Sequence, residues 1–198
     1  VTARQETAVL CVSLMPETTE EALAALHRVA GRADLAEIRL DAMQALDLDR
    51  LLAAPSCPVI VTFRPAREGG LYEGPEDERL RTLRRAARLG ARYIDVEHDA
   101  VQGLGDVPPE RVIVSYHNFD STPDDLAGLH HRMAESGAGT VKVAVTARHI
   151  LDTVPVLRLL HDATVPTVAL SMGERGVLTR ILARKFGALF TYAADDTG

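Results

Sequence analysis

Short runs of β-branched and apolar residues recur along this chain at intervals of about 25 residues, and turn-forming residues bound each run. Runs of this length and composition predict β-strands. Most of them are almost continuously hydrophobic, which is typical of parallel strands covered on both faces. The eight predicted strands span residues 9–14, 35–41, 59–64, 93–98, 112–117, 141–145, 167–172 and 189–192.

Amphipathic segments lie between most of these runs and predict helices. Thr18 and Glu21 form a capping-box pattern ahead of residues 22–29. Two more helices open at Pro75 and at residues 121–123, and close at Gly90 and Gly137.

Two of the connections are expected to be irregular. Residues 99–110 are few and contain Gly and Pro, so this crossover is not expected to form a full helix. Pro155 is expected to start or kink the sixth helix, because a proline inside a helix removes a backbone hydrogen bond.

Alternating strands and helices without a linker or a break in composition predict one domain over residues 1–198. Eight strands fit a closed parallel (β/α)8 TIM barrel better than an open doubly wound sheet. Periodicity alone leaves the open sheet as an alternative.

Composition excludes several classes of protein. A net charge of −6, four Tyr, four Phe and no Trp do not provide the basic, ring-bearing surface that nucleic-acid binding needs. No apolar run approaches the ~20 residues of a membrane span, and residues 1–14 lack the pattern of a signal peptide. We therefore expect a cytoplasmic chain with no membrane partner, in which Cys11 and Cys57 are reduced core residues.

Polar residues stand near the carboxyl ends of nearly all the predicted strands, where the active sites of (β/α) barrels lie. They follow the period of two that places side chains on one face of a strand. They are Ser13, Glu37 with Arg39, Thr62 with Arg64, Asp95 with Glu97, Ser115 with His117, and Lys142, with Met172 on the seventh strand. Taken singly, each has a structural explanation: Glu37 and Arg39 as an exposed ion pair, Asp95 and Glu97 as a structural polar layer, and Met172 as a core residue.

Lys142 is harder to explain structurally, because its neighbours Val141, Val143 and Val145 predict a buried strand. A lysine is seldom buried without a reason, although a snorkelling lysine on an edge strand remains an alternative. Burial and nearby cations are expected to lower its pKa and leave a neutral amine that can attack a carbonyl carbon. A Schiff-base lysine is therefore the functional hypothesis.

The sequence lacks the short motifs of several other chemistries. It contains no G-x-S-x-G elbow, P-loop, H-E-x-x-H pair or paired C-x-x-C. His130 and His131 are adjacent on a predicted helix, where successive side chains diverge by about 100°, so they make a poor metal pair.

Six blocks, in order and spacing, resemble the type I 3-dehydroquinate dehydratase family over most of the chain. The blocks are Val12-Ser13-Leu14-Met15, Glu37-Ile38-Arg39-Leu40-Asp41, Thr62-Phe63-Arg64 with Glu68-Gly69-Gly70, Ser115-Tyr116-His117-Asn118-Phe119, Val141-Lys142-Val143-Ala144-Val145, and Ser171-Met172-Gly173 leading to Arg180.

This resemblance implies roles for residues at the matching positions. Lys142 resembles the Schiff-base lysine, His117 the general acid/base, and Glu68 the carboxylate that orients this histidine. The implied substrate-binding residues are Arg180 for the carboxylate, Ser13, Glu37, Arg39 and Arg64 for the ring hydroxyls, and Met172 for packing against the ring. The implied reaction converts 3-dehydroquinate to 3-dehydroshikimate in the shikimate pathway and needs no metal or other cofactor.

The end of the chain departs from the family pattern. Family members continue after the eighth strand with a Ser-Ala-Pro-Gly-Gln-like substrate loop and a last helix, whereas this sequence stops at residue 198. We expect a barrel lacking the final helix, either truncated after strand eight or part of a larger polypeptide with a shikimate dehydrogenase-like domain. The resemblance also implies a homodimer. The alternatives are a class I Schiff-base aldolase and a non-catalytic barrel module of a larger protein.

Overall fold

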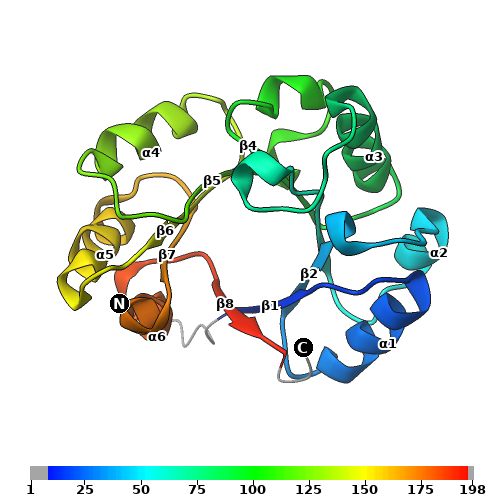
Figure 1. Cartoon of the computed structure of the whole chain (residues 1–198), viewed down its shortest axis with the longest axis horizontal. Helices are drawn as coiled ribbons and strands as arrows, with labels where there is room; N and C mark the ends of the chain where they lie inside the picture. The colour runs from blue at the N-terminus through cyan, green and yellow to red at the C-terminus, as the bar shows by residue number, and fades with distance from the viewer. Residues whose placement is uncertain (1–8, 196–198) are drawn as a thin grey trace, which may run out of the picture.

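The structure, a computed structural model, describes residues 9–195. Residues 1–8 and 196–198, which belong to the predicted domain and to the chain end discussed above, lie outside the described part. Within it, the eight strands are all parallel and alternate with helices that surround them (Figure 1). The strands are β1 Leu10–Leu14, β2 Leu35–Arg39, β3 Val59–Thr62, β4 Tyr93–Glu97, β5 Val112–Asn118, β6 Thr140–Thr146, β7 Thr167–Met172 and β8 Thr191–Ala194.

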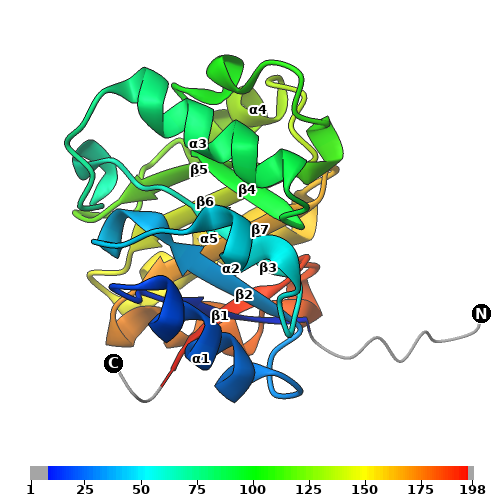
Figure 2. The same ribbon diagram turned by 90° about the vertical axis from the view of Figure 1, so that its right-hand side faces the viewer.

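The predicted barrel is confirmed. The hydrogen-bonded order is β7-β6-β5-β4-β3-β2-β1-β8, so the last strand pairs with the first. Between β7 and β8 the described residues form no ladder, and a single bond from Leu189 N to Thr167 O (2.8 Å) joins the two sides. The barrel is therefore nearly closed, and its strands run obliquely across it (Figure 2).

The outer layer consists of six α-helices and several short 3₁₀ turns within the described residues. The helices are α1 Thr19–Val29, α2 Leu48–Ala53, α3 Glu76–Arg88, α4 Leu126–Ala134, α5 Thr153–Asp162 and α6 Val177–Ile181. None of them has the length and apolarity that a membrane crossing requires.

The helix signals of the sequence are largely confirmed. Thr18 caps α1 by accepting from Glu21 N, and Pro155 lies in the first turn of α5, where its missing N–H has no helical partner to lose. Residues 99–110 form only the 3₁₀ turns Val101–Leu104 and Pro109–Arg111. Helix α4 begins later than predicted: Asp125, rather than residues 121–123, caps it by accepting from Gly128 N.

The interior of the barrel changes from apolar to polar along the strands. One apolar cluster at its amino end contains Cys11, Leu35, Ile60, Ile113, Val168 and Phe190. Both cysteines are free and buried, as predicted. Because side chains alternate along a strand, the next inward positions towards the carboxyl ends are Ser13, Glu37, Thr62, Asp95, Ser115, Lys142, Leu170 and Tyr192. The barrel thus collects polar groups at the depth where the sequence placed them.

Candidate active site

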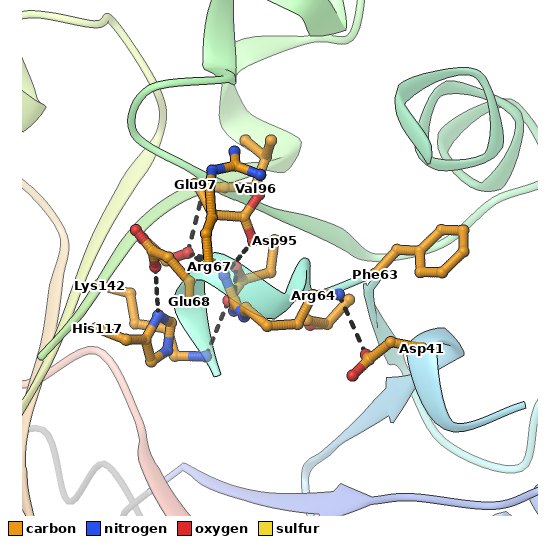
Figure 3. A network of polar contacts seen from close by, with 12 residues as sticks. Asp41, Phe63, Arg64, Arg67, Glu68, Asp95, Val96, Glu97, His117 and Lys142 are labelled. Atoms are coloured by element: carbon orange, nitrogen blue, oxygen red, sulfur yellow. Dashed lines mark hydrogen bonds and ion pairs between the residues drawn. The ribbon is translucent and has the colours of Figure 1, made fainter. Parts of the chain in front are cut away.

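Lys142 lies inside the barrel with 4% of its surface exposed. Its Nζ donates to Asp95 Oδ2 (2.8 Å) and to Glu37 Oε1 (3.2 Å), and lies 4.5 Å from the centre of the Tyr192 ring. These partners come from β2, β4 and β8, so the amine is held from several sides of the barrel, and Figure 3 shows its bond to Asp95. It is buried among charges rather than in an apolar cavity.

The expectation that burial lowers the pKa of Lys142 was wrong. Burial does penalise the ammonium, but the carboxylates of Asp95 and Glu37 outweigh it and raise the pKa above its ordinary value. The expectation counted burial and cations and left out two carboxylates that are distant in the sequence. At neutral pH the amine of Lys142 is therefore an ammonium group.

His117 and Glu68 form a second pair close to the lysine. His117 Nδ1 lies 2.9 Å from Glu68 Oε2, and both side chains are mostly buried. On the paired strands β5 and β6, Ser115 stands opposite Lys142, and His117 is two residues further along the same face. The sequence-predicted lysine, histidine and glutamate are thus brought to one end of the barrel (Figure 3).

The pKa values of this pair are shifted in opposite directions. Burial, followed by the charges of Arg64 and Lys142, holds the pKa of His117 well below 6.5. Burial raises the pKa of Glu68 from 4.5 to about 7, against the opposing charge of Arg64. At neutral pH the imidazole is therefore neutral, and the carboxyl is close to its own titration midpoint.

Arg64 is buried and connects Lys142 to the wall of the barrel. Its guanidinium donates to Asp95 Oδ1 (2.7 Å), Glu97 Oε1 (2.5 Å) and Ser115 Oγ (2.8 Å). The sequence placed Arg64 on the substrate, whereas these hydrogen bonds commit Nη1 and Nη2 to the protein. Burial by itself would raise the pKa of Asp95, but the positive charges of Arg64 and Lys142 outweigh it and hold that pKa well below its usual range.

The same network continues outwards through Arg79 on α3, whose side chain is fully buried. Arg79 Nη1 lies 2.7 Å from Glu97 Oε2 and donates to Phe63 O (2.8 Å), and its other nitrogens bind Glu76. Three cations and three carboxylates thus alternate in a chain in which each is less than a tenth exposed: Arg79, Glu97, Arg64, Asp95, Lys142 and Glu37. Breaking one of these buried pairs would leave an uncompensated charge in the interior, so the row of alternating charges holds each of its members in place.

The groups expected to bind ring hydroxyls lie around Glu37. Its carboxylate accepts from Ser13 Oγ (2.7 Å) and Thr62 Oγ1 (2.8 Å) as well as from Lys142. Arg39, which follows on the same face of β2, binds Asp41 with two hydrogen bonds. Ser13 and Glu37 therefore contact the lysine network directly, and Arg39 lies one step above it.

Met172 and Arg180 are placed by β7 and the helix that follows it. Met172 ends β7 opposite Thr146 and is half-buried. Arg180 lies on α6, and its burial lowers the pKa of the guanidinium. Within residues 9–195 it has no carboxylate at ion-pair distance, so its charge is available to an anion.

Asp95 and Tyr192 are contacts of Lys142 that the sequence did not assign to the site. The sequence favours a structural layer for Asp95, although its period of two with Glu97 and its place on β4 are signals that it points inwards. Tyr192 Oη lies 3.4 Å from Glu37 Oε1, and burial raises the pKa of its phenol well above the ordinary value. Its signal was the inward alternation of Phe190 and Tyr192.

A different hollow lies on the outer layer between α4 and α5, with a volume of about 480 Å³. His130 faces inwards there and lies 2.8 Å from Thr167 Oγ1, whereas His131 is exposed beside Glu135. The two histidines diverge, as predicted. In the described part of the chain, no group of three or more His, Cys, Asp or Glu is arranged to hold a metal ion.

A sequence model described as Type I 3-dehydroquinase matches residues 10–198. The chain belongs to the type I 3-dehydroquinase family. A 3-dehydroquinate dehydratase of Desulfotalea psychrophila is 36% identical over 199 residues, which cover 94% of this chain and 88% of that protein. A 3-dehydroquinate dehydratase of Methanopyrus kandleri is 38% identical over 177 residues, which cover 86% of this chain and 81% of that protein.

A bifunctional 3-dehydroquinate dehydratase/shikimate dehydrogenase of Arabidopsis thaliana is 42% identical over 177 residues. The match covers 83% of this chain but only 29% of that longer protein. Some members of the type I 3-dehydroquinase family are therefore fused to a shikimate dehydrogenase.

Solved structures agree with the fold. The 3-dehydroquinate dehydratase of Geobacillus kaustophilus has a TM-score of 0.83 and 26% identity, and the match covers 97% of this chain and 84% of that one. The type I 3-dehydroquinate dehydratase of Clostridium difficile has a TM-score of 0.86, and the match covers 96% of this chain and 85% of that one. Its sequence identity is 22%, so this likeness supports the fold alone. The predicted family, enzyme class and TIM barrel are confirmed.

Proposed function

We propose that this chain converts 3-dehydroquinate to 3-dehydroshikimate and water through an imine between Lys142 and the substrate ketone. The observation that carries the proposal is one buried lysine on the strand next to that of the His117–Glu68 pair, at the carboxyl end of a parallel barrel. An imine draws electrons from the adjacent carbon and acidifies its C–H bond, so the amine supplies the electron sink for the elimination.

The lysine must first lose a proton. Its ammonium is held by Asp95 and Glu37. His117 is the group that receives the proton, because its imidazole is neutral and lies on the same face of the neighbouring strand. Glu68 accepts from Nδ1–H of this ring, which leaves Nε2 as the basic nitrogen and stabilises the imidazolium once it forms.

The remaining steps use the same pair. Free Lys142 attacks the ketone carbon to form the carbinolamine. The proton that His117 took from Lys142 is then given to the carbinolamine hydroxyl, which leaves as water, so the iminium forms and the imidazole is neutral again. His117 then takes the proton from the adjacent carbon and returns one to the departing hydroxyl, which leaves as water. Hydrolysis of the iminium restores the amine of Lys142 and releases the unsaturated ketone.

The substrate-binding residues are assigned by chemistry and position. Arg180, half-buried and without a carboxylate partner in the described chain, binds the substrate carboxylate. Ser13, Glu37 and Arg39 bind ring hydroxyls, and Met172 packs against the ring. Arg64 joins them only through Nε–H or by exchanging one of its present partners, because Nη1 and Nη2 already donate to the protein.

Trapping the imine tests the proposal. The protein is incubated with 3-dehydroquinate, reduced with borohydride and mapped by mass spectrometry, while enone absorbance is followed in unreduced samples. We expect an adduct on Lys142 that disappears in Lys142→Ala. Lys185, the other lysine of the sequence, is exposed, so Lys185→Ala is the matched control and should retain the adduct.

Each alternative gives a different result. An adduct formed only with aldol substrates would favour an aldolase, and no adduct with any carbonyl compound would favour a non-catalytic barrel. For His117→Ala we expect imine formation without efficient elimination. Undiminished turnover in that variant would refute the role of His117.

The single-domain organisation, the homodimer, a shikimate dehydrogenase-like partner domain and the cytoplasmic location stay predictions. The fused relative of Arabidopsis thaliana motivates the partner domain. Light scattering of the purified chain measures its oligomeric state.

A further inference from the structure

Asp41, in the turn Leu40–Ala42 that follows β2, is a carboxylate near the site that accepts four hydrogen bonds. Oδ1 accepts from Arg39 Nε (2.9 Å) and from the backbone N of Arg64 (3.1 Å). Oδ2 accepts from Arg39 Nη2 (2.7 Å) and from the backbone N of Leu71 (3.1 Å). Its side chain is fully buried, and all four bonds require a carboxylate, because each partner is a donor.

Two of these donors are the stems of the loop that carries Glu68. The loop closes on itself through Tyr72 N to Arg64 O (3.3 Å) and Ala66 N to Tyr72 O (2.9 Å). It closes so tightly that a Cβ on Gly70 would lie 2.0 Å from Arg64 O. By binding the N–H of Arg64 on one stem and of Leu71 on the other, Asp41 fixes the base of this loop, as Figure 3 shows for Arg64.

The other two donors belong to Arg39. A guanidinium bound by two parallel hydrogen bonds is fixed in direction as well as in position. Arg39 lies on the inward face of β2, two residues beyond Glu37, and its side chain is 17% exposed. The two carboxylate oxygens of Asp41 therefore orient Arg39 towards the mouth of the barrel and also hold the base of the loop that carries Glu68.

We propose that Asp41 is a positioning residue for the dehydration: its carboxylate holds Arg39 towards the substrate and, through the loop stems, Glu68 against His117. This rests on the proposed function, because Arg39 and Glu68 are both assigned tasks in that reaction. Asp41 contacts neither the substrate nor Lys142. It acts by tying the binding group and the proton-transfer pair into one rigid unit.

The test is Asp41→Asn, which keeps the shape but places an NH₂ group against N–H donors. We expect a higher KM, because Arg39 is no longer aimed, and a lower kcat, because Glu68 no longer aligns His117. Together these should lower kcat/KM on the order of a hundredfold, the cost of a misplacement of about 1 Å. As the loop opens to solvent, the pH at which kcat/KM is half-maximal should move from about 7 towards lower values.

The matched control is Asp34→Asn. Asp34 Oδ2 also accepts a backbone hydrogen bond, from Leu10 N (2.8 Å), but at the amino end of the barrel. This variant should keep the kinetic constants and pH profile of the parent. Asp41→Asn should also lose most of its effect on kcat in a Glu68→Gln background, because residues that act through one another are not additive.

A readout independent of activity is amide hydrogen exchange, which should accelerate at Leu71 in Asp41→Asn and not in Asp34→Asn. If Asp41→Asn does not fold, Asp41→Glu keeps the charge, displaces the oxygens and should show the same changes to a smaller degree. A folded Asp41→Asn with parental KM and pH profile would overturn the inference. A parent that does not turn over 3-dehydroquinate would instead overturn the proposed function. The exchange measurement would still test whether Asp41 fixes the base of the Glu68 loop.

Discussion

Glu68 should make the folded chain less stable at alkaline pH, and Glu68→Gln should remove that penalty. A carboxyl whose pKa rises from 4.5 to about 7 on folding holds its proton more tightly in the folded chain by about 3 kcal/mol. This stabilisation is present below the unfolded pKa and is lost as the pH rises through the folded one. Glutamine does not titrate, yet its carbonyl still accepts from the Nδ1–H of His117.

The magnitude follows from the two pKa values. Between about pH 5 and pH 8 the parent should lose roughly 2 kcal/mol of stability relative to Glu68→Gln. His117 adds an opposite trend to both proteins, because its depressed pKa costs stability as the pH falls below its unfolded value. Taking the difference between variant and parent removes that trend to first order.

The assay is urea denaturation of both proteins at the two pH values, with the free energy of unfolding extrapolated to water. Glu73→Gln, an exposed carboxylate on the same segment, is the control, and its difference from the parent should be the same at both pH values. If Glu68→Gln is no more stable relative to the parent at pH 8 than at pH 5, Glu68 does not titrate as its burial requires. The variant should at the same time be a poorer catalyst, because a neutral amide does not stabilise the imidazolium.

Three further outcomes follow from the geometry. Arg79→Met leaves Glu97 Oε2 without its cation and should lower the free energy of unfolding in urea by about 3–5 kcal/mol, whereas Arg85→Met, on the exposed side of α3, should cost far less. Gly70→Ala sets a methyl group against Arg64 O, so kcat/KM should fall at least about tenfold while the circular dichroism spectrum of the barrel is retained; parental kinetics would show that the loop adapts freely. In the parent, kcat/KM should rise with pH through about 7 as Glu68 ionises, and this limb should be absent from the pH profile of Glu68→Gln.

The buried chain of charges is better explained by the reaction than by stability. Replacing buried ion pairs by apolar residues is often neutral or stabilising, so six buried charges are weak evidence for a stabilising role. In the proposed reaction Lys142 binds a ketone, and Asp95 and Glu37 hold its ammonium until then, which would explain why these charges are buried together. Arg79 extends that arrangement to α3 and Glu76, at the surface of the barrel.

The sequence by itself determined the order of strands and helices, because their apolar runs and caps act over a few neighbouring residues. It also pointed to Lys142 and His117 through their places near strand ends and, with Glu68, through the family resemblance; the structure brings the three side chains to one end of the barrel, and their roles stay predictions. Boundaries were less certain where tertiary contacts decide them. The eighth strand was expected at residues 189–192 and pairs with β1 over Thr191–Ala194, because the register with Leu10–Ser13 selects those residues.

Only the tertiary structure decided the charge state of the site. Lys142 contacts Glu37 across 105 residues of sequence and Asp95 across 47, and no local pattern encodes those distances. The local sequence correctly indicated that the lysine is buried, which taken alone lowers its pKa. The closed barrel brings two carboxylates within hydrogen-bonding distance of it, and their attraction in a medium of low polarity exceeds the cost of burial.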